Sequence, residues 1–225
     1  MKEFKSFMKT VGGNEGNKCH YPTRLDTYGC GCSHDCKYCY AKSLLDFRGL
    51  WNAESPAVAD IEKIKRKIAK LPVDTPVIRL GGMTDCFQPV EKQYGVTYET
   101  IKALNDRNIP YLIVTKSPLV AADKYIEVLN KSLAHIQITV TSTDDTLCKT
   151  YENAPPPSER IKAIEKLQEL GYDVAIRLSP YIIPYVDIDV INAIKCDKII
   201  VEFLRVNHRI KKWFDIDYSE YILKE

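Results

Sequence analysis

The chain has 225 residues, of which 45% are hydrophobic and 28% charged, and its formal net charge is +2. This length and apolar content are enough for one domain with a sizeable core. The net charge is too small to indicate a class of partner, and charge alone neither excludes nor supports nucleic acid. No apolar run approaches the length needed to span a membrane, and the polar start MKEFKSFMKT does not resemble a signal peptide.

The eight cysteines are spread along the chain without the spacing of a disulfide framework. Such frameworks belong to secreted proteins, so we expect a cytoplasmic protein with reduced thiols. Cys19, Cys148 and Cys196 stand apart from the others and are expected to be small buried residues.

Apolar, β-rich runs alternate with helical patterns, which is typical of βα units and a parallel sheet. In chain order, six strands are predicted at 24–28, 77–80, 111–115, 136–140, 174–178 and 198–203. Apolar residues three or four apart predict helices at Ile61, Ile64 and Ile68 and at Ile161, Ile164 and Leu167. The second of these helices is expected to begin after the proline run 155–157 and to end at Gly171.

Six consecutive βα units predict an α/β fold in which parallel strands curl into a partial (β/α)6 TIM-type barrel. We expect residues 23–206 to form this barrel, with an N-terminal extension at 1–22 and a helical segment at 207–225 packed on it. Barrel active sites lie at the carboxyl ends of the strands. Polar residues gather at these ends here, at 81–85, 115–117, Thr139, Thr141, Ser142, Arg177 and Ser179. Turns also place Gly, Ser and Thr at strand ends, so site and turn remain alternatives.

The most informative motif follows the first predicted strand, where Cys32, Cys36 and Cys39 form Cys-x3-Cys-x2-Cys within GCGCSHDCKYCY. A cubane [4Fe-4S] cluster has four iron corners, so three cysteines leave one iron open to bind a small molecule. Cys30 provides a fourth thiol, and the alternative is a structural zinc held by four cysteines in an interaction module. His34, inside the loop, is expected to face solvent or to hydrogen-bond the loop.

With Tyr38 before the last cysteine, the motif resembles the cluster motif of radical S-adenosylmethionine (radical SAM) enzymes. The resemblance implies an enzyme in which Cys32, Cys36 and Cys39 hold a [4Fe-4S] cluster and S-adenosylmethionine binds its open iron. In that family an electron from the cluster cleaves the cofactor to a 5'-deoxyadenosyl radical, which abstracts hydrogen from a substrate. A reductant such as flavodoxin or ferredoxin is then an expected partner.

Residues 24–184 resemble, within that superfamily, the spore photoproduct lyase-like group, also described as DNA repair photolyase-like. Similar stretches include Thr84-Asp85, the strand end at 114–116 and the run 141–160. The resemblance implies that Tyr40 packs near the adenine, Thr84 meets the methionine amino group, Lys116 meets the carboxylate or ribose, Thr141 binds the ribose, and the Ser179 backbone lies along the adenine. Gly81 and Gly82 permit close backbone approach to a ligand, and Arg177 completes the expected cofactor-binding set.

The chain also departs from the pattern of that group after the second strand. Gly82 occupies the position of a cysteine that returns a hydrogen atom to the substrate radical in spore photoproduct lyase. Cys86, four residues further on, is a candidate alternative donor at the mouth of the site, and the other interpretation is a buried cysteine under the turn at 87–89. Asp85 replaces the superfamily's usual glutamate and is expected to receive the amino group of S-adenosylmethionine, or else to cap its own turn.

The resemblance indicates nucleic acid or a nucleotide as the first expectation for the substrate, with a peptide or small metabolite as the alternative. Basic and aromatic residues interleave near the C-terminus, at Arg205, Arg209, Lys211, Lys212, Trp213 and Phe214. Such a segment can bind a nucleic-acid strand. The interpretation we favour is an amphipathic helix whose aromatic face closes the open edge of the barrel. The sequence leaves the oligomeric state open.

Overall fold

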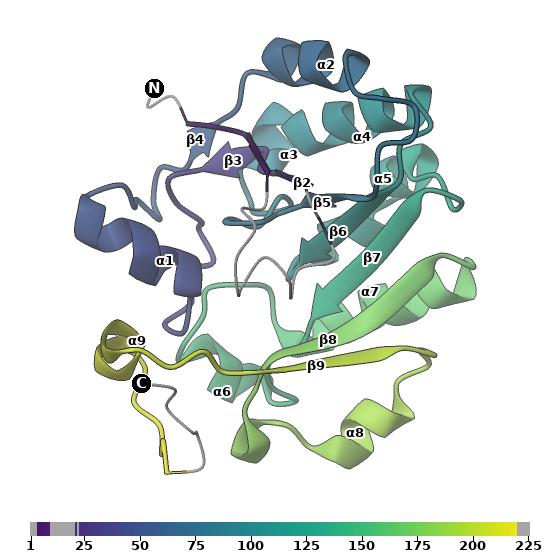
Figure 1. Cartoon of the computed structure of the whole chain (residues 1–225). Helices are drawn as coiled ribbons and strands as arrows, with labels where there is room; N and C mark the ends of the chain where they lie inside the picture. The colour runs from purple at the N-terminus through teal and green to yellow at the C-terminus, as the bar shows by residue number, and fades with distance from the viewer. Residues whose placement is uncertain (1–3, 10–20, 22, 220–225) are drawn as a thin grey trace.

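A computed structural model describes residues 4–9, 21 and 23–219, so most of the predicted N-terminal extension lies outside the described residues, Cys19 and His20 included. The structure is built on a seven-stranded sheet in the order β1-β2-β5-β6-β7-β8-β9 (Figure 1). Its strands are β1 (Phe7–Lys9), β2 (Thr23–Leu25), β5 (Ile78–Leu80), β6 (Tyr111–Thr115), β7 (Ala134–Thr139), β8 (Asp173–Tyr181) and β9 (Ile199–Phe203). Neighbours from β2 to β9 are parallel, whereas β1 pairs antiparallel with β2. The six predicted parallel strands are confirmed, and β1 is an edge strand that the sequence pattern did not predict.

The first parallel strand is shorter than predicted. It ends at Leu25, because the next residue, Asp26, turns its carboxylate to the loop after β5 and accepts a hydrogen bond from the Met83 N–H at 2.8 Å. The chain then forms β3 (Tyr28–Gly29), which pairs with β4 (Ala57–Val58) in a separate two-stranded sheet. The other predicted strands lie within a few residues of the observed ones.

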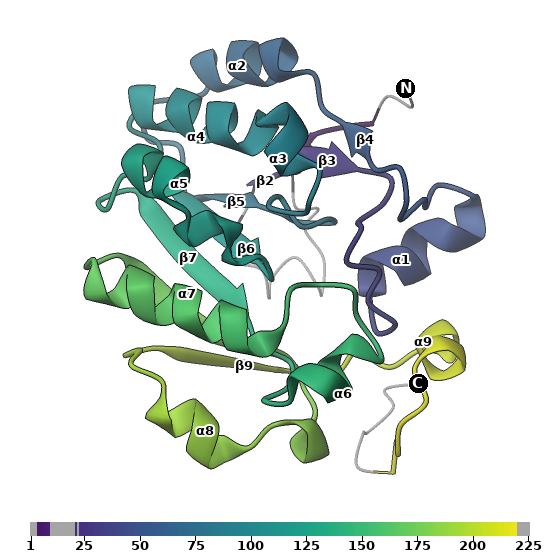
Figure 2. The same cartoon turned by 180° about the vertical axis from the view of Figure 1, so that it is seen from behind.

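Helices cover one face of the curved sheet, and α2, α4, α5 and α7 follow one another along it (Figures 1 and 2). The helices are α1 (Tyr40–Leu45), α2 (Ile61–Ala69), α3 (Glu91–Tyr94), α4 (Val96–Asp106), α5 (Asp123–Val128), α6 (Asp145–Lys149), α7 (Pro157–Glu169), α8 (Ile188–Ala193) and α9 (His208–Trp213). Short 3-10 turns lie at Asp46–Arg48, Pro118–Ala121 and Ile183–Tyr185. None of the helices in the described part of the chain is long and apolar enough to cross a bilayer.

The main core fills the space between the sheet and these helices. Ile64 and Ile68 of α2 and Ile164 and Leu167 of α7 are buried in it, as their spacing predicted. Helix α7 begins at Pro157, where the fixed φ of proline and its missing N–H suit the first turn. The sheet and its helices have the arrangement of a partial TIM-type barrel, which confirms the predicted fold class.

The C-terminal segment packs as an amphipathic helix, but not at the predicted place. Ile210 and Phe214 are buried in a second apolar cluster with Cys36, Tyr38, Cys148 and Tyr151. Helix α9 therefore lies against the cysteine loop and α1 and does not close the edge at β9 (Figure 1). Lys211 and Lys212 on its other face remain exposed.

Candidate functional site

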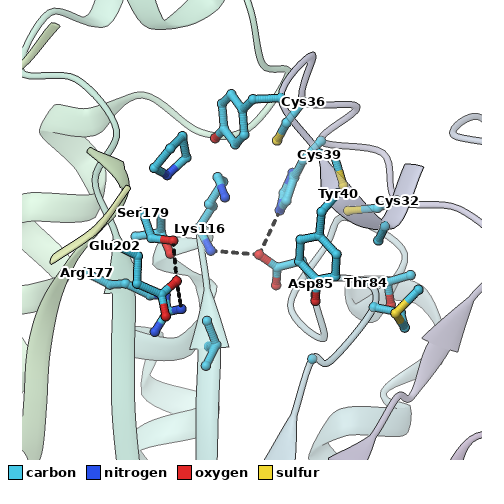
Figure 3. A pocket seen from close by; sticks show the side chains of 18 of the residues that line it. Cys32, Cys36, Cys39, Tyr40, Thr84, Asp85, Lys116, Arg177, Ser179 and Glu202 are labelled. Carbon is cyan, nitrogen blue, oxygen red and sulfur yellow. Dashed lines mark hydrogen bonds and ion pairs between the residues drawn. The ribbon is translucent and has the colours of Figure 1, made fainter. Parts of the chain in front are cut away.

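A cavity of about 200 Å³ opens at the carboxyl ends of the parallel strands. The cysteine loop and the start of α1 form one wall, the turn after β5 contributes residues 81–85, and Lys116, Arg177 and Ser179 lie across from them (Figure 3). This is the end of the sheet at which polar residues were predicted to gather, because parallel strands direct their carboxyl ends to one edge.

The three predicted cluster cysteines all line this cavity, whereas Cys30 does not. The loop that carries them turns twice, with the Asp35 N–H bonded to the Cys32 carbonyl at 3.0 Å and the Cys39 N–H bonded to the Cys36 carbonyl at 3.1 Å. Cys39 then caps α1, and its Sγ accepts the Lys42 N–H at 3.4 Å. The loop thus presents three thiols from one short segment to one cavity.

Two distant connections fix the position of the cysteine loop. The Ser33 N–H donates to Gln88 Oε1 at 3.0 Å, which ties the loop to the segment after β5. On the other side, the Lys37 N–H bonds the Tyr151 carbonyl at 2.9 Å and the Asn153 N–H bonds the His34 carbonyl at 2.7 Å. The loop is therefore held by residues from both sides of the barrel mouth.

The three cavity thiols are buried or half-buried, which affects their protonation. Burial raises the pKa of the Cys32 thiol to about 12 and also raises the pKa values of Cys36 and Cys39, so the thiols stay protonated until a metal favours their thiolates. An iron–sulfur cluster distributes its thiolate ligands over separate iron atoms, so three thiols on one cavity fit such a cluster.

A buried carboxylate, Glu152, lies directly behind the cysteine loop. It accepts hydrogen bonds from the Tyr38 hydroxyl and the Arg160 guanidinium and lies 3.7 Å from Cys36 Sγ. Burial alone would raise its pKa, but the charges of Arg160 and Lys116, with the hydrogen bonds, hold the pKa of Glu152 at about 2. Glu152 lies in the similar stretch 141–160, but no role was predicted for it from the sequence.

Asp85 organises the turn after β5. Its Oδ1 accepts the Phe87 N–H at 2.8 Å and the Thr115 hydroxyl at 2.7 Å, and its Oδ2 accepts the Lys116 N–H at 2.7 Å. His34 Nε2 lies 3.3 Å from the same Oδ2. Burial would raise the pKa of this carboxyl, but His34 and these hydrogen bonds lower it to about 2. These three hydrogen bonds occupy most of the roughly four acceptor positions of the carboxylate, and its role in binding an amino group stays a prediction.

Glycine is required at the first position of this turn. Gly81 has φ +75°, and a Cβ there would lie 2.9 Å from the Val114 carbonyl oxygen. At Gly82 a Cβ would meet the Arg24 side chain at 3.0 Å. The turn therefore brings its backbone close to β6 and leaves room for a ligand above it.

The structure brings most of the predicted cofactor-binding residues together. The cavity is lined by Tyr40, Gly81, Gly82, Thr84, Asp85, Lys116, Arg177 and Ser179. The Tyr40 hydroxyl donates to the Gly82 carbonyl, and the Thr84 hydroxyl donates to the Tyr28 carbonyl at 2.6 Å. The Thr84 oxygen can still accept a bond from an ammonium group, because a hydroxyl has two lone pairs.

Three predicted positions differ from those observed. Thr141 is completely buried, its hydroxyl 3.2 Å from that of Tyr151, and Thr139 lines the cavity in its place. Cys86 is 1% exposed in the main core and does not line the cavity, so its predicted place at the mouth of the site is wrong and the buried interpretation holds. His34 does not face solvent but is buried against Asp85.

Several cavity residues were not predicted. Arg79, Glu202 and Arg205 line it, and Glu202 accepts bonds from the Arg177 guanidinium and, at 2.9 Å, the Ser179 hydroxyl (Figure 3). For Arg79 and Glu202 the sequence did contain a signal, which is a charged residue inside an otherwise apolar strand. Parallel strands are usually buried on both faces, so a charge within one is unusual.

Comparison with known proteins identifies the family. A family model described as the radical SAM superfamily matches residues 27–195. The chain therefore belongs to the radical SAM superfamily, whose members use a [4Fe-4S] cluster and S-adenosylmethionine.

Relatives and solved structures agree with this assignment. The uncharacterized protein MJ0683 of Methanocaldococcus jannaschii is 29% identical over 168 residues, which cover 72% of this chain and 61% of its own. The uncharacterized protein Rv2578c of Mycobacterium tuberculosis is 26% identical over 159 residues, 67% of this chain and 47% of its own. This chain thus spans about half to three fifths of the length of these relatives.

Two solved structures share the fold at low sequence identity. A spore photoproduct lyase with bound AdoMet and dinucleoside spore photoproduct has a TM-score of 0.66 and 13% identity, covering 88% of this chain and 64% of that one. Streptococcus suis SuiB bound to S-adenosylmethionine has a TM-score of 0.61 and 17% identity, covering 84% of this chain and 42% of that one.

Proposed function

We propose that this chain is a radical SAM enzyme that uses S-adenosylmethionine to abstract a hydrogen atom from its substrate. The observation that carries the proposal is the convergence of Cys32, Cys36 and Cys39 on one cavity at the strand ends. When bound, the cluster supplies the electron that cleaves the cofactor to a 5'-deoxyadenosyl radical. The cluster would be held by these three cysteines, with one iron left for the cofactor.

The chain's own groups bind and orient the cofactor. The Lys116 ammonium is a flexible donor for the methionine carboxylate, and Thr84 offers an acceptor for the amino group. The turn at Gly81 and Gly82 lets the backbone approach the ligand, while the Tyr40 ring supplies an aromatic surface near the adenine. Arg177 and Ser179, tied together through Glu202, form the opposite side, where the backbone of Ser179 is proposed to lie along the adenine.

The substrate we propose is nucleic acid or a nucleotide. Support comes from the similarity in fold to spore photoproduct lyase with its bound dinucleoside, and from the cations that line the cavity. A peptide or small metabolite is the second candidate. We also propose a flavodoxin or ferredoxin as reductant, a barrel at 23–206, and a cytoplasmic location in keeping with cysteines that lack framework spacing.

Cluster binding can be tested without turnover. After anaerobic reconstitution with iron and sulfide, we expect the wild-type protein to show cluster absorbance and, once reduced, an electron paramagnetic resonance signal that changes when S-adenosylmethionine is added. Alanine at Cys32, Cys36 or Cys39 should abolish the signal, whereas the control Cys196→Ala should retain it. An equal signal in Cys36→Ala would contradict the proposed ligand set.

A further inference from the structure

Two arginines lie side by side on the concave side of the sheet, beneath the turn after β5. Arg24 of β2 and Arg79 of β5 are register partners in neighbouring parallel strands, so their side chains leave the sheet on the same face. Arg79 lines the cavity, and Arg24 packs under Gly82. The pair therefore places two guanidinium groups next to each other at the base of the site.

Each guanidinium holds a buried donor that has no hydrogen-bond partner among the described residues. The Nε atoms of Arg24 and Arg79 are both buried without a hydrogen bond to a described residue. The charge of Arg24 acts on Asp26 and that of Arg79 on Glu202, since each lowers the pKa of that carboxyl, but neither carboxylate bonds these Nε atoms. A buried donor without an acceptor destabilises the folded state by about 1–3 kcal/mol, and a charged group by more. Two adjacent like charges also repel. Such a pair is expected where a ligand supplies the missing acceptor.

The described acids of the cavity already bind other groups. Among the described residues, the lining contains the cations Arg79, Lys116, Arg177 and Arg205 and two carboxylates, Asp85 and Glu202. Asp85 holds the turn through three hydrogen bonds. Glu202 binds Arg177 and Ser179. Arg79 thus remains a cation in the cavity wall to which no described carboxylate is hydrogen-bonded.

The cofactor does not supply the missing anion. S-adenosylmethionine carries one carboxylate together with an ammonium and a sulfonium group, and its carboxylate is assigned above to Lys116. A phosphate monoester carries close to two negative charges and three acceptor oxygens. The planar fork of arginine matches that geometry with two parallel hydrogen bonds.

We propose that Arg79, supported by Arg24, binds a phosphate group of the substrate. The inference rests on the proposed function, because it assumes that the substrate binds in the part of the cavity that S-adenosylmethionine does not fill. It identifies a phosphate-bearing molecule as the substrate class and Arg79 as the residue that anchors it.

The test is calorimetric titration of the reconstituted full chain with inorganic phosphate, in a phosphate-free buffer with S-adenosylmethionine present. We expect the wild-type protein to bind phosphate, Arg79→Gln to bind it about ten- to a hundredfold more weakly, and Arg79→Lys to fall between them. Arg66→Gln, an exposed arginine of α2, is the matched control and should bind like the wild type. Circular dichroism of each variant establishes that it is folded.

Three outcomes would overturn the proposal. These are no phosphate binding by the wild type, equal phosphate binding by Arg79→Gln, and a loss of S-adenosylmethionine affinity in Arg79→Gln as large as the loss for phosphate. Acetate that binds as tightly as phosphate would also count against the proposal, because the site would then not select phosphate over a carboxylate. The titration needs no turnover, so a wild type that binds phosphate but forms no 5'-deoxyadenosine would count against the proposed function alone.

Discussion

Removing the charge of Glu152 should destabilise the fold even without a cluster. The Arg160 side chain is completely buried, and Glu152 is the acid that pairs with it. In Glu152→Gln the guanidinium keeps its bonds to the Pro155 carbonyl at 2.6 Å and the Thr139 carbonyl at 3.1 Å, but it loses its counter-charge. A buried charge left unpaired is among the most costly single changes in a protein.

The expected size of the effect follows from this burial. Breaking a buried ion pair on one side costs about 3–5 kcal/mol. For a domain of this size each kcal/mol lowers Tm by about 2–4 °C, so we expect a Tm lower by roughly 6–20 °C. Thermal and urea unfolding of the protein before reconstitution, followed by circular dichroism, measure the loss.

Matched variants separate this effect from a general weakening of α7. Glu169→Gln changes an exposed glutamate of α7, the helix that carries Arg160, and should alter stability by less than about 0.5 kcal/mol. The double variant Glu152→Gln, Arg160→Met should lose less unfolding free energy than the two single variants together, because it no longer contains an unpaired buried charge. A loss below about 1 kcal/mol in Glu152→Gln would refute the reasoning about the buried pair.

Three further predictions concern the turn after β5. Gly81→Ala should lower the free energy of unfolding in urea by about 1–3 kcal/mol more than Gly171→Ala does. Both residues have positive φ, but only at Gly81 would the added Cβ lie 2.9 Å from a carbonyl oxygen. Equal losses would show that the backbone near Gly81 can move aside. Asp85→Asn should lower the free energy of unfolding in urea by about 1.5–3 kcal/mol, because the charge of Asp85 supports three hydrogen bonds. The exposed control Asp106→Asn should change it little. An Asp85→Asn variant as stable as the wild type would contradict the role of Asp85 in holding the turn. Cys86→Ala should leave 5'-deoxyadenosine formation unchanged in a chromatographic assay, because this thiol lies in the core away from the cavity. A large fall in 5'-deoxyadenosine from a folded variant would contradict this separation from the site.

The parallel strands and the metal-binding loop were predictable because their signals are local. Alternating strand and helix patterns give a sequential parallel sheet, and three cysteines within eight residues need no knowledge of the fold to indicate a metal site. Strand ends meet at one edge in any such sheet, which is why Lys116, Arg177 and Ser179 were correctly expected to lie together.

The rest of the site depends on contacts between distant parts of the chain. Glu152 meets Cys36 across a separation of 116 residues, and no local pattern reports that contact. Thr141 was misplaced because β7 ends at Thr139, beyond which the alternation of strand side chains no longer applies. The charge of Arg79 was visible in the sequence, but that its buried Nε has no hydrogen-bond partner among the described residues appears only when the neighbouring strands are in place.

The most direct test of the central claim is cleavage of S-adenosylmethionine. The protein would be reconstituted anaerobically with iron and sulfide, supplied with S-adenosylmethionine and dithionite, and assayed for 5'-deoxyadenosine beside Cys36→Ala and Cys196→Ala. We predict 5'-deoxyadenosine from the wild type and from Cys196→Ala, and none above background from Cys36→Ala. A cluster-loaded wild type that forms no 5'-deoxyadenosine, or product formation that persists in Cys36→Ala, would contradict the account.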